Sequence, residues 1–225
     1  MSKGSGRTRG AKNSHSTSTP PVEFSGTVNL GGSGKNVEIV VGALENSRSI
    51  SSIADRATVK ELQRGISRFE AKIGIKERSV RVGDLDKMNA LGVTYVARDG
   101  KSMGILLNQR FFDRKKSTIE NDVVQNHYNT GFKNHTNAPL QHTITHELSH
   151  AVWNAGMRSK SALGAKKEIS ALYGKWVKDK KKKGYGEYAK TNLSEFYAEG
   201  MTKAIHGNAD KYTRKLVHIT KKYGL

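Results

Sequence analysis

Two histidines stand four residues apart in the stretch THELSHAVW, residues 145–153, and a glutamate directly follows the first. Residues at i and i+4 lie one above the other on a helix, so the rings of His146 and His150 can reach a single metal ion. Glu147 projects about a quarter turn away, where a general base acting on a metal-activated water would stand. The spacing therefore predicts part of a metal-dependent hydrolytic site.

The histidines must be carried by a helix. Asn137 and Pro139 predict a cap and a first-turn proline for a helix that runs to Gly156. Four apolar residues share one side of this helix, which we expect to enter the core: Ile144, Leu148, Ala151 and Ala155. The two histidines then face whatever lies across from that side.

Other residues near the motif have simpler interpretations. His142 lies one turn before the motif, and we expect it at the rim of the site. His127, His135 and His206 have no partner at helical spacing and are expected on the surface. Trp153 falls on the histidine side, where it either lines the cleft or packs in the core.

A catalytic zinc ion takes three protein ligands and keeps a fourth position open. The chain has no cysteine, so the third ligand must be His, Asp or Glu. No such residue follows at the close spacing HExxHxxGxxH, because Ser159 and Lys160 stand there. Further on, in YAKTNLSEFYAEGMTKA (188–204), Glu195 and Glu199 are four apart on a predicted helix, and Tyr188 precedes Glu195 by seven residues.

The histidine-glutamate helix, the tyrosine and the later "EFxAE" helix together resemble the gluzincin metallopeptidases, and within them the catalytic domain of the anthrax lethal factor type. The resemblance covers roughly residues 100–206, and it departs from the pattern at Tyr197 and Gly200, neither of which is a proposed ligand.

The resemblance implies a role for each motif residue. His146, His150 and Glu195 would be the metal ligands, and Glu147 would be the general base. Tyr188 would donate a hydrogen bond to the developing oxyanion or leaving group. Glu199 would orient a ligand histidine.

Each of the later residues also has a purely structural interpretation. Asn192 and Glu195 fit a capping box, which would explain the glutamate without a metal. Tyr188 would also be explained by packing against the last helices, and Glu199 by a place on the surface.

The chain as a whole predicts an α+β fold with β-rich segments first and helices last. Within it we expect a zincin-like domain over 22–225, in which a small mixed sheet packs on the histidine helix. Residues 1–21 are rich in Gly, Ser, Thr and basic residues, which predicts a disordered basic arm. Residues 22–50 are open to a separate interpretation as an N-terminal β-hairpin.

The individual elements follow from hydrophobic spacing and turn residues. Strands are expected over 22–30, 36–42, 79–82, 93–98 and 104–112, with a hairpin turn at Asp99–Gly100. Helices are expected over 55–73, 117–128, 160–182, 192–206 and 209–222, besides the histidine helix. The segment 100–112 is the strand along which we expect an extended polypeptide substrate to bind by backbone pairing.

Charge is the unusual feature of the composition. Lysine and arginine number 39 against 20 acidic residues, which gives a net charge of +19 over 225 residues. Such a balance favours polyanions as partners, and the basic arm and the run Lys180–Lys183 are the expected contact points for nucleic acid or another acidic partner. No Sec-type signal peptide and no membrane span is evident. We therefore expect a protein that is cytoplasmic in the producing cell, virion-associated, or exported by a signal-independent route.

Taken together, the motifs predict a zinc-dependent endopeptidase that hydrolyses a peptide bond with a metal-activated water. Its biological setting is expected to be that of a toxin or effector, or of a protease encoded by a phage or mobile element. The alternative is a basic nucleic-acid- or virion-associated protein in which a zincin fold is structural or inactive.

Overall fold

The computed structural model describes residues 27–30, 32–74, 79–88, 90–96, 103–125, 136–158, 162–179 and 185–225. Its strands are β1 (Thr27–Asn29), β2 (Arg48–Ser49), β3 (Ser79–Gly83), β4 (Gly92–Val96) and β5 (Met103–Asn108). Its helices are α1 (Lys35–Glu45), α2 (Arg56–Ile73), α3 (Gln109–Phe112), α4 (Lys116–Val123), α5 (Pro139–Gly156), α6 (Ala162–Lys178), α7 (Leu193–Ile205) and α8 (Lys211–Tyr223). The α+β class predicted from the sequence is therefore confirmed.

The strands form one mixed sheet in the order β1-β4-β5-β3-β2. β3 and β5 run parallel, β4 is antiparallel to β5, β1 runs parallel to β4, and β2 is antiparallel to β3. The pairing of β4 with β5 aligns Thr94 with Ile105. Antiparallel pairing of these consecutive strands agrees with the predicted hairpin, although the turn Asp99–Gly100 itself lies outside the described residues.

The segment 100–112 was expected to be an edge strand that pairs with the substrate, and this expectation is wrong. β5 lies inside the sheet between β4 and β3, so its backbone groups are paired on both sides. The strand also ends at Asn108, whose side chain accepts a hydrogen bond from the backbone of Arg110 and caps the short helix α3. Among the described strands, the sheet edges belong to β1 and β2.

The strand expected over 36–42 is also wrong, because these residues belong to α1. The β-branched residues in NVEIVVG suggested a strand, but Val40 and Ala43 are buried at helical spacing, and Val37 and Leu44 pack beside them. β1 pairs with β4 rather than with a neighbouring hairpin strand. The described part of residues 22–50 is therefore not a separate β-hairpin.

Helices α5 and α2 agree closely with the sequence prediction. Asp55 caps α2 by accepting a hydrogen bond from the backbone of Thr58, and Gly74 ends the helix in the left-handed region. Pro139 is the first residue of α5, as expected, but Asn137 is not its cap. Ala138 holds the capping position, and its methyl side chain offers no acceptor to the helix. The backbone N–H of Ala138 donates a hydrogen bond to Oγ1 of Thr136.

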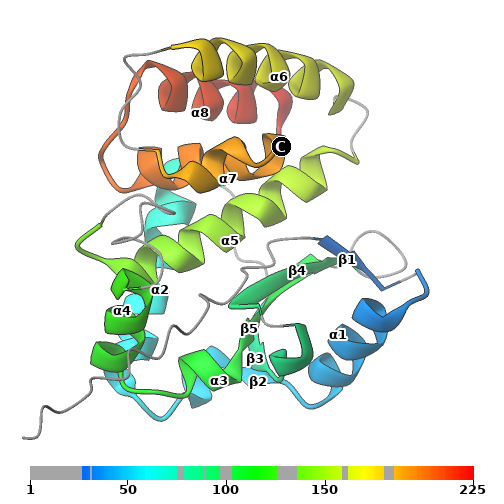
Figure 1. Cartoon of the computed structure of the whole chain (residues 1–225), viewed down its shortest axis with the longest axis vertical. Coiled ribbons are helices and arrows are strands. Elements are labelled where there is room, and N and C mark those ends of the chain that lie inside the picture. The colour runs from blue at the N-terminus through cyan, green and yellow to red at the C-terminus, as the bar shows by residue number, and fades with distance from the viewer. Residues whose placement is uncertain are drawn as a thin grey trace, which may run out of the picture.

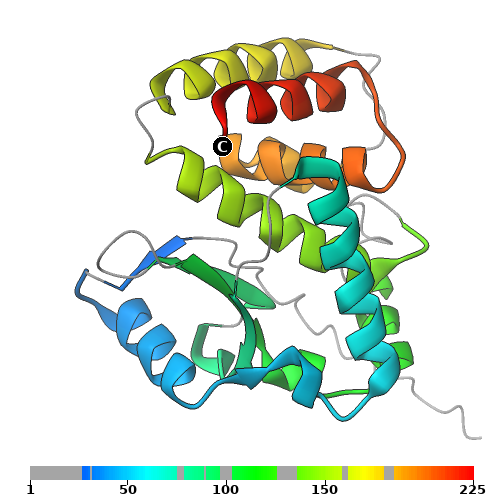
Figure 2. The same cartoon turned by 180° about the vertical axis from the view of Figure 1, so that it is seen from behind.

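The arrangement is layered around α5, which crosses the middle of the molecule (Figure 1). The sheet lies on one side of α5, α7 packs along its other side, and α6 and α8 form the outermost layer beyond α7 (Figure 2). Helix α2 crosses α5 and extends to the level of α7. Every residue of α5 from Pro139 to Trp153 is buried. The predicted core face is present, but the histidine side is buried as well, because α7 covers it.

The remaining helices lie close to their predicted ranges. α4, α6, α7 and α8 correspond to the segments expected over 117–128, 160–182, 192–206 and 209–222. Among the residues described, no helix combines the length and apolar character that crossing a bilayer requires. Predictions for the arm 1–21, the run Lys180–Lys183, His127 and His135 fall outside the described part of the chain.

Candidate metal centre

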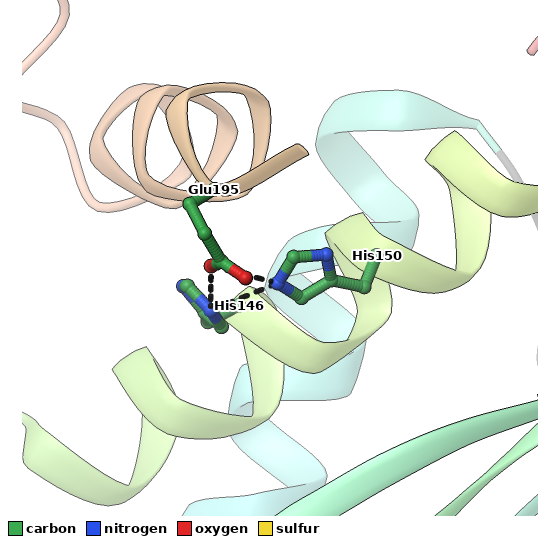
Figure 3. A group of neighbouring side chains, drawn as sticks. All are labelled: His146, His150 and Glu195. Carbon is green, nitrogen blue, oxygen red and sulfur yellow. Dashed lines mark hydrogen bonds and ion pairs between the residues drawn. The ribbon is translucent and has the colours of Figure 1, made fainter. Parts of the chain in front are cut away.

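Helix α5 supplies two of the three converging side chains. His146 and His150 project from successive turns toward α7, and their Nε2 atoms lie 3.1 Å apart (Figure 3). The helix is held firmly behind them, since Ile144 packs against Gly65 of α2 so closely that a Cβ on that glycine would lie 2.3 Å from the Ile144 side chain. The histidine pair therefore stands on a rigid support.

Helix α7 supplies the third side chain. Asn192 caps this helix, and its side chain accepts a hydrogen bond from the backbone of Glu195 at 2.9 Å. Glu195 thus lies in the first turn, from which its carboxylate extends to the two histidines (Figure 3). The capping role predicted for Asn192 is confirmed, and it coexists with the position of Glu195 beside the rings.

The spacing of the three side chains matches a tetrahedral metal site. Oε2 of Glu195 lies 3.1 Å from Nε2 of His150 and 3.3 Å from Nε2 of His146. Two ligand atoms of a tetrahedral zinc ion, each about 2.0–2.1 Å from the metal, are separated by about 3.3 Å. His146, His150 and Glu195 thus form a group that fits a metal ion.

Burial adds a chemical reason for a cation here. The residues His146, His150 and Glu195 are 0%, 1% and 2% exposed. Burial acts to raise the pKa of Glu195, but the charges and hydrogen bonds of His150 and His146 outweigh it and hold that pKa below its usual range. An ionised carboxylate buried against imidazole nitrogens is well matched to a positive ion.

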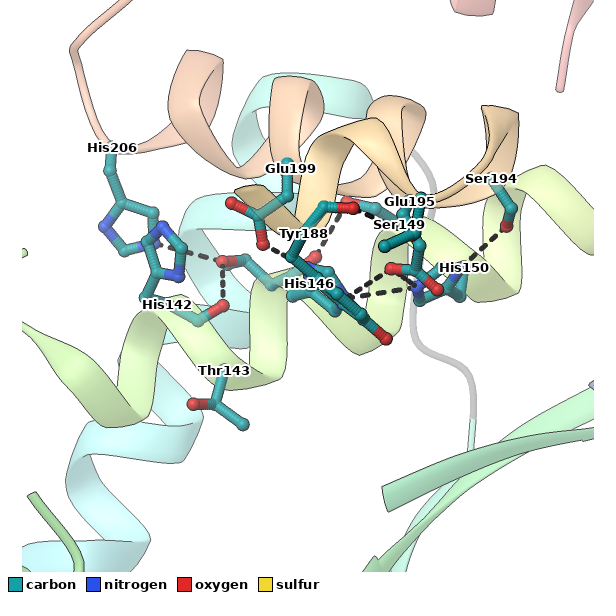
Figure 4. A network of polar contacts seen from close by, with 12 residues as sticks. His142, Thr143, His146, Ser149, His150, Tyr188, Ser194, Glu195, Glu199 and His206 are labelled. Carbon is teal, nitrogen blue, oxygen red and sulfur yellow. Dashed lines mark hydrogen bonds and ion pairs between the residues drawn. The ribbon is translucent and has the colours of Figure 1, made fainter. Parts of the chain in front are cut away.

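The outer nitrogens of both rings also have partners. Nδ1 of His146 lies 2.9 Å from Oε1 of Glu199, and Nδ1 of His150 lies 3.0 Å from Oγ of Ser194 (Figure 4). A proton on Nδ1 of each ring leaves the lone pair of Nε2 directed at the centre. Glu199 is therefore buried beside a ligand histidine rather than on the surface.

Ser194 contacts a histidine of the candidate centre, and the sequence analysis did not single it out. It lies two residues after the cap of α7 and next to Glu195, so its contact with His150 follows once α7 is placed against α5. The only available signal was its position within the first turn of that helix.

Glu147 occupies a different side of α5 from the ligand group. It is fully buried, and its Cγ lies 3.6 Å from the position that a Cβ on Gly92 would take at the start of β4. The side chain therefore lies between α5 and the sheet, on the same helical turn as His146. Its role as a general base stays a prediction.

Tyr188 belongs to the short 3₁₀ helix η4 (Glu187–Lys190), which precedes α7. Its ring stacks on His146 with centroids 5.8 Å apart, and its hydroxyl is directed away from α7 (Figure 4). The tyrosine therefore lies at the centre, although it also packs tightly, with only 7% of its surface exposed.

The structure also places three neighbouring residues, His142, His206 and Trp153. His142 is buried rather than at a rim, with its ring 5.5 Å from that of His206. His206 is half-buried, and its Nε2 lies 3.1 Å from Oγ1 of Thr145. Trp153 packs in the core against Tyr197, with ring centroids 5.2 Å apart.

Comparison with known proteins leaves the centre to be interpreted from its own chemistry. No family model, no curated protein and no solved structure matches the chain.

Proposed function

We propose that the protein is a zinc-dependent endopeptidase. The observation that carries this proposal is the convergence of His146, His150 and Glu195, from two helices, at the spacing of a tetrahedral site. Two imidazoles and one carboxylate are a ligand set typical of catalytic zinc, and they leave one position open. Glu147 and Tyr188 lie beside this group, and the likeness to gluzincins noted in the sequence supports the same reaction.

The proposed reaction divides the work among these residues. A zinc ion held by the three ligands would lower the pKa of a water molecule and polarise the scissile carbonyl. Glu147 accepts the proton of the attacking water and passes it to the leaving amine. Tyr188 donates a hydrogen bond to the oxyanion that develops on the carbonyl. Glu199 and Ser194 keep the two imidazoles in the required orientation.

We propose that the substrate is a polypeptide bound in extended form. Since β5 is paired on both sides, strand addition would have to use another edge of the sheet. Of the two described edge strands, β1 packs against α5, whereas β2 lies at the far edge. The edge of β1 is therefore the proposed site of backbone pairing.

Peptide cleavage and metal content together test the proposal. Wild type and Glu147→Gln are each loaded with zinc and incubated with a peptide library made from a digested proteome, and new termini are identified by mass spectrometry. We expect defined cleavages by the wild type and a loss of at least about 10²-fold in the variant, with zinc retained by both. Equal cleavage by both proteins would contradict the assignment of Glu147.

The same assay separates a toxin or effector from a general peptidase. A toxin or effector would cut one folded target protein at a defined bond, whereas a general peptidase would cut unstructured peptides broadly. Incubation of both proteins with an intact cell extract, followed by the same identification of termini, distinguishes these outcomes.

A further inference from the structure

The outer face of α8 carries charges of one sign only. The buried side of this helix, which includes Tyr212, Leu216 and Ile219, packs toward α6 and α7. The exposed side carries these residues: Lys211, Arg214, Lys215, His218, Lys221 and Lys222. The helix contains no acidic residue. Such a face is unusual because surface charges of opposite sign are normally interspersed.

Helix α6 extends the same positive face. It lies beside α8 in the layer farthest from the sheet (Figures 1 and 2). Its exposed charged residues are again all cations: Lys166, Lys167, Lys175 and Lys178. Together the two helices present nine exposed lysine and arginine side chains, and we call this surface the α6–α8 face.

Two acidic residues, Glu168 and Asp179, lie in the seam between the helices. Glu168 of α6 accepts hydrogen bonds from Lys222 at 2.5 Å and from Tyr223 at 2.7 Å. Asp179, just after α6, lies 2.8 Å from Nζ of Lys211 and accepts a hydrogen bond from Tyr212 at 2.7 Å. These contacts join the two helices at two places, and apart from Glu168 neither α6 nor α8 contains an acidic residue.

Like charges at i and i+4 repel one another and destabilise a helix. Lys211 and Lys215 have this spacing. The helix also contains two pairs of consecutive cations, Arg214–Lys215 and Lys221–Lys222. No feature of the metal centre requires this arrangement, because α7 separates the α6–α8 face from His146 and His150 (Figure 1). A polyanionic partner would relieve the repulsion.

We propose that the α6–α8 face binds the phosphate backbone of a nucleic acid without reading its sequence. The 13 residues of α8 span about 20 Å, a length over which one strand of a duplex carries roughly six phosphates. An anionic membrane fits less well, because the apolar side of α8 is already buried. A membrane-surface helix must keep that side available for lipid. Only Leu163 and Val177 of α6 are large exposed apolar residues in this layer.

Duplex binding tests the proposal with two matched triple variants. One variant, Arg214→Gln, Lys215→Gln, Lys221→Gln, removes three charges from the α6–α8 face. The control, Lys35→Gln, Lys60→Gln, Lys87→Gln, removes three exposed charges from α1, α2 and the segment between β3 and β4. Binding of a fluorescent 20-base-pair duplex of random sequence is followed by anisotropy at several salt concentrations, with circular dichroism as the check on folding.

We expect the α6–α8 variant to bind at least about tenfold more weakly at 0.1 M salt, and the slope of log affinity against log salt to fall by roughly two to three. The control should stay within about twofold of the wild type. Glu147→Gln should bind like the wild type, which makes the result independent of peptidase activity. Equal losses in both triple variants would show diffuse attraction and overturn the proposal.

A second measurement uses the unaltered protein. Acylation of lysines with and without the duplex should show protection of Lys215 and Lys221 and little protection of Lys35 and Lys87. Binding to vesicles of anionic lipid together with no binding to the duplex would favour a membrane and overturn the proposal. An absence of protection at the α6–α8 face would also overturn the proposal.

Discussion

His146 and His150 contact chemically different partners through their outer nitrogens. The outer nitrogen of His146 faces the carboxylate of Glu199, whereas that of His150 faces the hydroxyl of Ser194. A carboxylate raises the basicity of an imidazole ligand more strongly than a neutral hydroxyl does. The two rings are therefore expected to contribute unequally to metal affinity.

Substitution of the two partners tests this difference. We expect Ser194→Ala to weaken zinc affinity about tenfold and Glu199→Gln to weaken it by up to about 10²-fold, because each ring loses an orienting contact. The measurement is competition with a chromophoric chelator. Ser170→Ala, at an exposed position of α6, is the control and should leave affinity unchanged. Wild-type affinity in both partner variants would contradict the assigned contacts.

The hydroxyl of Tyr188 is the proposed donor to the oxyanion. Tyr188→Phe keeps the ring that stacks on His146 and removes only that hydroxyl. We expect kcat to fall by roughly 10²–10³ with unchanged zinc content, since the contact forms mainly in the transition state. Steady-state kinetics on a peptide found in the library screen provides the measurement. A rise in KM at constant kcat would instead indicate a role in binding.

At this scale the structure brings the three proposed ligands together with Tyr188 and Glu199, as the sequence suggested. The roles of these residues and of Glu147 stay predictions. Periodicity placed His146 and His150 on one side of a helix, and the gluzincin resemblance singled out Glu195. Ser194 escaped notice because a serine near a helix start is common and its partner lies 44 residues away. The burial of His142 depends on His206 at the end of α7, a contact that no local pattern predicts.

At the scale of elements, two glycines set the distance between helices. Gly65 lets α2 approach α5 behind the histidines, and Gly200 lets α7 approach Leu216 of α8. A Cβ on Gly200 would lie 2.3 Å from Cδ1 of Leu216. Gly200 departs from the gluzincin pattern, and this close packing explains its presence in the helix.

Gly200→Ala is therefore expected to destabilise the fold by roughly 1–3 kcal/mol, because α8 must move away from α7. Gly174→Ala is the matched control, since Gly174 is a helical glycine of α6 with nothing within 4 Å of the added Cβ. In the control, the free energy of unfolding should rise by about 0.5–1 kcal/mol, because alanine favours a helix more than glycine does. Urea unfolding measures the stability of both variants against the wild type. A loss of stability in both variants, or in neither, would show that the contact with Leu216 does not control packing.

Sequence patterns predicted elements well where local signals agreed. α2 has a capping aspartate, a continuous apolar stripe and a terminal glycine, and its bounds were correct within one residue. α1 was mistaken for a strand because its β-branched residues outweighed a short helical period. The position of β5 inside the sheet depends on pairing with β3, which lies earlier in the chain, so strand order was beyond local reasoning.

At the scale of the whole molecule, protonation links a buried histidine to stability. Burial, together with the positive charge of Arg68, lowers the pKa of His206 from its ordinary 6.5, against the opposing effect of a hydrogen bond that the ring donates to the backbone carbonyl of Gln141. The unfolded chain then binds more protons than the folded chain in this range. Stability from His206 is therefore complete above pH 6.5 and is lost as the pH falls through the lowered pKa.

His206→Gln should lose less stability than the wild type when the pH is lowered from 8 to 5. Urea midpoints at both pH values, in the presence of a chelator that removes metal, provide the comparison. His218→Gln, at an exposed histidine of α8, is the control and should follow the wild type. An identical pH response in all three proteins would contradict the role assigned to His206.

The candidate metal centre also joins distant parts of the chain, since its three side chains come from α5 and α7. Zinc that binds only the folded state must raise its stability. The α+β order was predicted from the sequence. The position of α7 between α5 and α8 was not, because it depends on packing between helices that are distant in the chain.

The amount of zinc bound per chain tests directly whether His146, His150 and Glu195 form a metal site. Wild type, His146→Ala, Glu195→Ala and Glu147→Gln are each equilibrated with zinc, freed of excess by dialysis and analysed for bound metal per chain. We expect close to one zinc ion per chain in the wild type and in Glu147→Gln, and almost none in His146→Ala and Glu195→Ala. A wild type without zinc, or a Glu195→Ala variant that keeps a full equivalent, would contradict this expectation.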